Sequence, residues 1–154
     1  MTSKPLQGFT VIDCSAVYAG PICARLLADA GADVIKIESP GAGDQTRGPT
    51  GSSRVFAHFN AGKRSIALDL KQPRGQAVAR ELMARADIFI ENFRPGVMQR
   101  FGLDYASVAE DQPHLVYCSI SGFGQQGPFA QHGAYAPIAH ASSGYDKAHM
   151  AGQA

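Results

Sequence analysis

The chain has 154 residues, close to the usual size of one domain, and 45% of them are hydrophobic while 18% are charged, proportions typical of a folded globular protein. Fourteen Lys and Arg nearly balance thirteen Asp and Glu, and no basic stripe indicates a nucleic-acid partner. No apolar run approaches the ~18–20 residues of a membrane span, and residues 1–8 lack the apolar stretch of a signal peptide. Three cysteines without a C-x-x-C pair are typical of reduced thiols. We therefore expect a cytoplasmic protein with no membrane or nucleic-acid partner.

The first part of the chain predicts a strand, a helix and a second strand. Residues 9–13 form a short apolar run typical of a buried strand. Pro21 suits the first turn of a helix, and Gly31 is expected to follow the end of that helix in a left-handed conformation. Residues 33–37 form the second predicted strand. Together these segments predict a right-handed βαβ unit.

The same alternation continues to residue 120. Residues 38–63 are predicted to be a long glycine-rich loop, of a kind that is usually functional in a compact domain. Further strands are expected over residues 65–70, 87–91 and 115–120, and helices from Pro73, from Pro95 to residue 101, and over residues 105–110. Strands that alternate with helices favour a Rossmann-like α/β fold, in which a mostly parallel sheet has helices on both faces. Beyond residue 121 we expect a Gly- and Gln-rich loop and a weak helix over residues 137–143, and the last dozen residues show no periodic pattern or capping signal.

The loop after the first strand, residues 15–21, is the first candidate binding segment. In an open α/β sheet, ligands bind at the carboxyl ends of the strands. The loop lacks the G-x-G-x-x-G pattern of a dinucleotide site, which disfavours NAD binding. Gly20 and Pro21 would let a ligand approach the N–H groups at the start of the helix. A plain tight turn is the alternative, and the residues alone favour it slightly.

Two further turns are expected at the same edge of the sheet. Residues 92–96 combine an amide side chain, Arg94 and a helix start, with Arg100 further along the helix. A guanidinium beside a helix N-terminus suits a phosphate, whereas the alternative is an ordinary turn with solvated arginines. Asp69 and Lys71 follow the third strand, where they would either bind polar groups of a ligand or form a surface ion pair.

Other kinds of site are not predicted. The five histidines share no metal-ligand spacing. The Gly-rich segment 121–128 lacks the Lys-Ser/Thr pair of a P-loop, and the G-x-S-x-G pattern of a hydrolase is absent. Asp146 is expected to be an ordinary loop residue.

An ordered set of motifs runs through the whole chain. It comprises residues 11–13, 19–21, 26–38, 43–48, 60, 63–65, 68–71, 86–87, 91–96, 100, 102 and 119–124. In this order the motifs resemble the family III CoA-transferases, a group that includes formyl-CoA transferase, the carnitine CoA-transferases and 2-methylacyl-CoA racemase. The resemblance implies that residues 1–154 form the N-terminal part of the CoA-binding large domain, without the small domain or the C-terminal return segment.

The resemblance also implies where CoA binds. The reacting end of CoA is expected near the first loop, the adenine and ribose phosphate near the third strand, and the phosphates near the turn at residue 92. The implied CoA-binding residues are Val17, Tyr18, Ala19, Leu68, Asp69, Leu70, Lys71, Asn92, Phe93, Arg94, Arg100 and Tyr135. Tyr135 stands where the racemase branch has its histidine base, and His132 and His140 are out of register, which disfavours racemase chemistry. Ser39 stands where many transferases carry a basic residue.

In this family an aspartate attacks the acyl-CoA thioester, and CoA passes through an aspartyl-CoA thioester to an acceptor carboxylate. The resemblance places that aspartate past Ala154, so we expect no catalytic residue in this chain and no activity from the chain alone. CoA and acyl-CoA are substrates, with a carboxylic acid as acceptor, and no permanently bound cofactor or metal is expected. The resemblance implies an interlocked homodimer for the full-length family. The alternatives are an acyl-CoA racemase or isomerase of the same family, or a non-catalytic CoA-binding module.

Overall fold

The chain forms two compact units, Met1–Ile120 and Ser121–Ala154. The structure is a computed structural model that describes residues 3–48 and 53–151.

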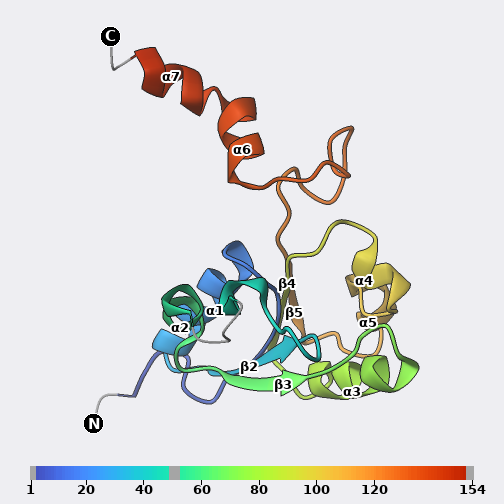
Figure 1. Ribbon diagram of the computed structural model, residues 1–154. Helices are drawn as coiled ribbons and strands as arrows, with labels where there is room; N and C mark the ends of the chain where they lie inside the picture. Colours follow the sequence, from blue (N-terminus) through green and yellow to red (C-terminus); the bar gives the residue numbers. More distant parts are fainter. Residues whose placement is uncertain (1–2, 49–52, 152–154) are drawn as a thin grey trace. The chain divides into compact units, whose positions relative to one another are not determined.

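The first unit is built on a sheet of parallel strands. The strands are β1 (Thr10–Cys14), β2 (Asp33–Glu38), β3 (Arg64–Ala67), β4 (Ile88–Glu91) and β5 (Val116–Ser119). They form a 5-stranded sheet in the order β3-β2-β1-β4-β5, and every neighbouring pair is parallel (Figure 1). In this register Asp13 on β1 is paired with Lys36 on β2, and Cys14 is paired with Glu91 on β4. The predicted parallel α/β fold is confirmed.

Helices cover both faces of this sheet (Figure 1). The helices are α1 (Ala19–Asp29), α2 (Arg54–Asn60), α3 (Pro73–Met83), α4 (Val97–Arg100) and α5 (Tyr105–Val108). Successive strand residues point to opposite faces, so Val11 packs with α1 residues such as Ala24, whereas Ile12 packs with Met83 of α3. The two resulting apolar clusters fix the sheet between its helices and thereby set the positions of the loops at its edge.

Several predicted boundaries are confirmed. Helix α3 begins at Pro73, and Gly31 follows α1 with a φ of +107°. Other boundaries differ from the prediction. The third strand ends at Ala67, so residues 68–71 lie beyond it. The helix predicted to begin at Pro95 starts instead at Val97.

The prediction of an unbroken loop over residues 38–63 is wrong. This segment contains a short 3-10 helix, η1 (Gln45–Arg47), and helix α2. The Ser53 hydroxyl caps α2 by accepting a hydrogen bond from the N–H of Val55 at 3.2 Å. The guanidinium of Arg47 stacks 3.7 Å from the ring of Phe56, which ties η1 to α2. The contact of Arg47 with Phe56 therefore adds stability from outside α2 to a helix that was not predicted from its own residues.

The second unit contains a loop followed by α6 (Ala136–Ser143) and α7 (Tyr145–Ala151). The sequence predicted a weak helix at α6 and missed α7. Gly144 separates the two helices with a φ of +76°. Asp146 lies in the first turn of α7 and pairs with His140 at 3.6 Å, so the interpretation of Asp146 as a loop residue is wrong.

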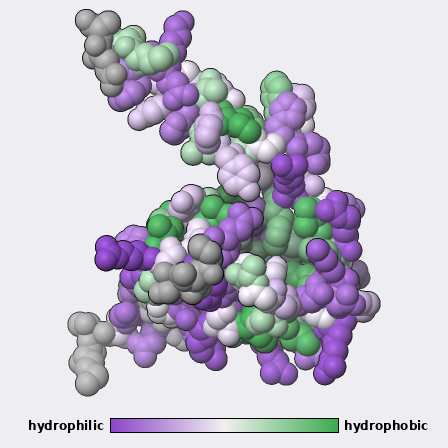
Figure 2. Space-filling model, viewed as in Figure 1, coloured by the Kyte–Doolittle hydropathy of each residue, from purple (hydrophilic) through white to green (hydrophobic). Residues whose placement is uncertain are grey.

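The surface drawn in Figure 2 mixes hydrophilic and hydrophobic side chains. Exposed apolar residues include Ile22 and Leu26 on α1. Among the helices in the described ranges, none has both the length and the apolar character needed to cross a membrane.

Candidate functional site

The centre of the sheet is the place where a fold of this type binds ligands. The chain passes from β1 toward β2 and β3 on one side of the sheet, and β4 and β5 lie on the other side of β1. The loops after β1 and β4 therefore border the crevice at this switch in strand order. The Asn92 side chain joins the two loops, because it accepts a hydrogen bond from the Ala16 N–H at 2.9 Å and donates one to the Ala16 carbonyl at 2.7 Å.

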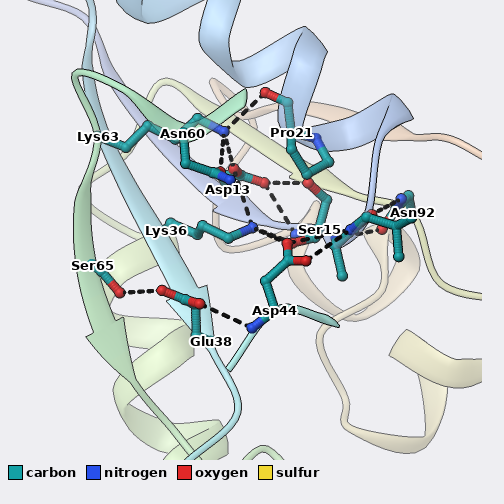
Figure 3. A network of polar contacts seen from close by, with 12 residues as sticks. Asp13, Ser15, Pro21, Lys36, Glu38, Asp44, Asn60, Lys63, Ser65 and Asn92 are labelled. Atoms are coloured by element: carbon teal, nitrogen blue, oxygen red, sulfur yellow. Dashed lines mark hydrogen bonds and ion pairs between the residues drawn. The ribbon is translucent and has the colours of Figure 1, made fainter. Parts of the chain in front are cut away.

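Beside this crevice lies a buried cluster of four charges: Asp13, Lys36, Asp44 and Lys63 (Figure 3). Lys63 Nζ lies 2.7 Å from Asp13 Oδ2, and Lys36 Nζ lies 3.1 Å from Asp44 Oδ2. Each of the four side chains is at most 1% exposed. Buried charges are tolerated when they are paired and hydrogen-bonded. With two ammonium and two carboxylate groups, the cluster meets that requirement.

The two lysines also hold the backbone of the loop after β1. Lys36 donates to the Ser15 carbonyl at 2.6 Å, and Lys63 donates to the Pro21 carbonyl at 2.9 Å. Lys63 donates further to the Asn60 side chain at 2.9 Å. Burial lowers the pKa of Lys63, although the charge of Asp13 opposes this effect. The first and last residues of the turn 15–21 are thus fixed by ammonium groups from other parts of the chain.

A second ionic group supports Asp44 from the side of β2. Glu38 accepts two hydrogen bonds from Arg47, at 2.8 and 2.6 Å, and one from Ser65 at 2.6 Å. It also accepts the backbone N–H of Asp44 at 3.0 Å. Burial would raise the pKa of Glu38, but these hydrogen bonds outweigh it and lower the pKa to about 2. Glu38 therefore remains ionised at neutral pH and anchors the loop that carries Asp44.

The backbone at Val17 is strained. Its φ is +71°, and among the non-glycine residues of the described ranges only Val17 has a positive φ. The left-handed region costs an ordinary L-residue about 1–2 kcal/mol and is especially unfavourable for a β-branched one. The Val17 N–H donates to both carboxylate oxygens of Asp44, each at 3.3 Å. Strain of this kind concentrates at functional sites.

The start of α1 follows this strained residue directly. Within residues 3–48 and 53–151, the N–H groups of Ala19 and Gly20 donate no hydrogen bond. Gly20 is required for steric reasons, since a Cβ there would lie 2.2 Å from the Cβ of Ser15. Ser15 itself is held by the Asp13 carboxylate, through its N–H at 3.1 Å and through its hydroxyl. In the described part of the chain, the rigid turn thus leaves two backbone N–H groups without an acceptor, one at the exposed Ala19 and one at the buried Gly20.

The structure places the predicted residues Val17, Tyr18 and Ala19 in this turn. Tyr18 and Ala19 are exposed, and Val17 is half-buried. The Tyr18 ring packs edge-on against Phe59 of α2, with 5.4 Å between the ring centroids. Because Asn92 is bonded to the neighbouring Ala16, these three residues and Asn92 come together at one place.

The predicted phosphate-binding residues near β4 divide into two groups. Arg94 and Arg100 are exposed. Phe93 is half-buried against the apolar core on the α3 face, and its N–H donates to Glu91 at 2.8 Å. Burial raises the pKa of Glu91, despite its hydrogen bonds to Phe93 and Ser119. The predicted helix start at Pro95 is wrong, because α4 has only four residues and begins after Gly96. The two arginines are therefore the main positive feature of this loop.

The predicted residues after β3 lie at an edge of the sheet. Strand β3 is outermost, with β2 between it and β1. Leu68 and Leu70 are half-buried against the core. The Asp69 carboxylate accepts the backbone N–H of Lys71 at 3.0 Å, and among the described ion pairs none joins these two side chains. The alternative of a surface ion pair is therefore wrong, and Lys71 is exposed.

Tyr135, the last predicted CoA contact, lies in the second unit, where it is exposed at the start of α6. Its role stays a prediction.

The four buried charges, at Asp13, Lys36, Asp44 and Lys63, are not among the residues predicted to bind CoA. Lys36 interrupts the apolar run of residues 34–37, and Asp13 follows the apolar residues of β1. A charge inside a buried strand was the signal that could have identified the cluster. Within residues 3–48 and 53–151, no group of three His, Cys, Asp or Glu side chains is arranged to hold a metal ion.

Comparison with known proteins shows the family to which the chain with this site belongs. The model of CoA-transferase family III matches residues 6–154. The chain belongs to this family. The resemblance stated from the sequence motifs is thus confirmed. A CAIB/BAIF family protein from Brucella suis has the same fold, with a TM-score of 0.87 and 42% identity, over 93% of this chain and 40% of that one.

Two curated relatives show the range of names in the family. Succinyl-CoA:glutarate CoA-transferase of Mus musculus is 45% identical over 92% of this chain and 34% of its own length. Acetyl-CoA:oxalate CoA-transferase of Acetobacter aceti is 47% identical over 91% of this chain and 37% of its own length. The chain thus spans about a third of the length of these relatives. A short chain dehydrogenase/reductase family protein, at 18% identity and a TM-score of 0.53, shares the fold alone.

Proposed function

We propose that this chain supplies the CoA-binding crevice of an enzyme that transfers CoA between an acyl-CoA and a free carboxylic acid. On this proposal, residues 1–154 correspond to the N-terminal part of the large domain. The observation that carries the proposal is the rigid turn 15–21, joined by Asn92 to the loop after β4 at the switch in strand order, in a chain of CoA-transferase family III. The relatives named above are CoA-transferases, which favours transfer over the racemase or isomerase alternative.

The charges around the crevice suit the phosphates of CoA. Arg94 and Arg100 are exposed on the β4 side, and guanidinium groups bind phosphate oxygens in a bidentate manner. Lys71 and Asp69 would contact the adenosine end from the edge of the sheet. The N–H groups of Ala19 and Gly20 would face the reacting end.

The transfer that we propose is covalent. An aspartate carboxylate, which we expect outside these 154 residues, attacks the thioester carbonyl; the C–S bond breaks, and a mixed anhydride and CoA thiolate form. The thiolate then attacks the aspartyl carbonyl, which releases the first acid and leaves an aspartyl-CoA thioester. An acceptor carboxylate takes CoA by the same two steps in reverse, which frees the aspartate. Splitting one difficult exchange into easier steps is the advantage of covalent catalysis.

The contribution of this chain is to hold CoA and to stabilise charge. A thiolate that leaves during the first step has to return during the second, so CoA must remain bound between them. The N–H groups of Ala19 and Gly20 are suited to stabilise an oxyanion, because they are fixed before the reaction and need no reorganisation.

A calorimetric titration of the 154-residue chain with CoA tests this proposal. We expect saturable binding at micromolar CoA, and an affinity about tenfold or more weaker when Arg94→Gln and Arg100→Gln are combined. Arg85→Gln is the matched control, because Arg85 is an exposed arginine after α3 and should leave the affinity unchanged. Absence of binding by a chain that is folded by circular dichroism, or equal losses in both variants, would contradict the proposal.

A further inference from the structure

The turn 15–21 is held by side chains from several other parts of the chain. Asn92 binds Ala16, and Asp44 binds Val17. The two buried lysines bind the carbonyls of Ser15 and Pro21. These partners come from β2, from the loop before η1, from the approach to β3 and from the loop after β4 (Figure 3).

Asp44 differs from the other partners because it acts on the strained residue. Val17 has a φ of +71°, a conformation that a β-branched residue leaves unless its surroundings oppose the change. The Asp44 carboxylate is the group that accepts the Val17 N–H. If this carboxylate moved away, Val17 would be free to relax toward a negative φ, and the backbone of Tyr18 and Ala19 would turn with it.

The Asp44 carboxylate is itself held in place. Lys36 lies 3.1 Å from its Oδ2, and the N–H and hydroxyl of Thr46 donate to its Oδ1 at 2.9 and 2.8 Å. The Asp44 side chain is 1% exposed. Its own N–H is bound by Glu38 at 3.0 Å, so neither the backbone nor the side chain of Asp44 can adjust easily.

We propose that Asp44 is a positioning residue for CoA binding: its carboxylate, held by Lys36 and Thr46, keeps Val17 in the left-handed conformation and so keeps the N–H groups of Ala19 and Gly20 available to the ligand. This inference rests on the proposed function for its ligand. It adds a residue that lies outside the predicted CoA contacts and acts through the backbone of Val17.

A double-mutant cycle with Val17→Gly separates positioning from general support of the fold. Glycine adopts a positive φ without strain, so a chain with Val17→Gly needs Asp44 less. In calorimetric titration with CoA, we expect Asp44→Asn to weaken binding about tenfold in the Val17 chain, but less than about threefold in the Val17→Gly chain. Equal losses in the two chains would overturn the inference. Asp33→Asn is the matched control, because Asp33 is exposed at the start of β2.

Amide hydrogen exchange gives a readout that needs no ligand. We expect Asp44→Asn to speed exchange at the Val17 N–H about tenfold, with no change at the amides of β1. If the unsubstituted chain fails to bind CoA, the proposed function fails, and exchange at Val17 still decides whether Asp44 positions the turn. Unchanged exchange at Val17 would overturn the inference.

Thr46→Val covers the case in which Asp44→Asn does not fold. It removes only the hydroxyl that donates to Asp44 at 2.8 Å and leaves the charge pair with Lys36. We expect faster exchange at Val17 and about threefold weaker CoA binding, both reduced in the Val17→Gly chain. No change in either quantity would overturn the inference.

Discussion

Replacement of Lys63 by methionine tests the buried charge cluster. Methionine is nearly as long as lysine, so little space is left empty, but the ammonium that lies 2.7 Å from Asp13 Oδ2 is lost. The Asp13 side chain is 0% exposed and cannot be hydrated in the folded state. Removing one partner of a buried ion pair costs about 3–5 kcal/mol. Because Lys36 remains 3.8 Å from Asp13, we expect the lower value, about 3 kcal/mol of the free energy of unfolding.

The adjacent residue supplies the control. Arg64 pairs with Asp33, but these side chains are 65% and 54% exposed. Exposed ion pairs contribute about 0–1 kcal/mol, so Arg64→Met should lower the free energy of unfolding by less than about 1 kcal/mol. Both substitutions remove one cation from neighbouring positions and leave the same net charge.

Urea unfolding at pH 7, followed by circular dichroism and extrapolated linearly, measures both changes. Combining Lys63→Met with Asp13→Asn should recover part of the loss, because the uncompensated charge is removed. Equal losses for Lys63→Met and Arg64→Met, or a further loss on adding Asp13→Asn, would refute the reasoning that charge neutralisation in the cluster stabilises the fold.

Three further tests concern the charge of Glu38, the burial of Cys14 and the close packing around Gly20. The pKa of Glu38 is about 2 in the folded state, so its contribution to stability is lost as the pH falls from the unfolded pKa through the folded one. Lowering the pH from about 4.5 to about 2 should therefore reduce the free energy of unfolding by about 2–3 kcal/mol. Thermal melts should show that most of this loss disappears in Arg47→Gln, and an equal loss of stability in the Arg47→Gln chain would contradict the assignment to Glu38. Burial raises the pKa of Cys14 to about 12, so at pH 8 only about one thiol in ten thousand is ionised. Mass spectrometry should therefore find Cys14 alkylated by iodoacetamide far more slowly than the half-buried Cys23 and Cys118, and comparable rates would argue against the burial of Cys14. Gly20→Ala should lower the free energy of unfolding by about 2–4 kcal/mol in urea, because the methyl group would lie 2.2 Å from the Cβ of Ser15, and full stability would show that the turn is not rigid.

The parts of the fold that the sequence predicted well are those encoded locally. Strands β1 and β2 are short apolar runs, and α3 begins at a proline. Helix α2 was missed because its stability comes from packing against α1 and η1, through contacts such as Tyr18 with Phe59 and Arg47 with Phe56, while its flanking sequence is rich in Gly and Ser.

The candidate site divides in the same way. The turn 15–21 could be located from the order of strands and helices, since the position of a switch in strand order depends on topology. The charge cluster could not, because Lys63 and Asp13 are separated by 50 residues and Val17 and Asp44 by 27. Charged residues inside strands signal that partners exist, but only the tertiary fold shows which residues they are.

We propose that CoA binds in the crevice between the loops after β1 and β4. Hydrogen–deuterium exchange of the chain with and without saturating CoA tests it most directly. We expect bound CoA to slow exchange in residues 15–20 and 92–100 and to leave exchange unchanged in α5 at residues 105–108. If CoA protected neither loop, or protected only other segments, CoA would not bind in this crevice.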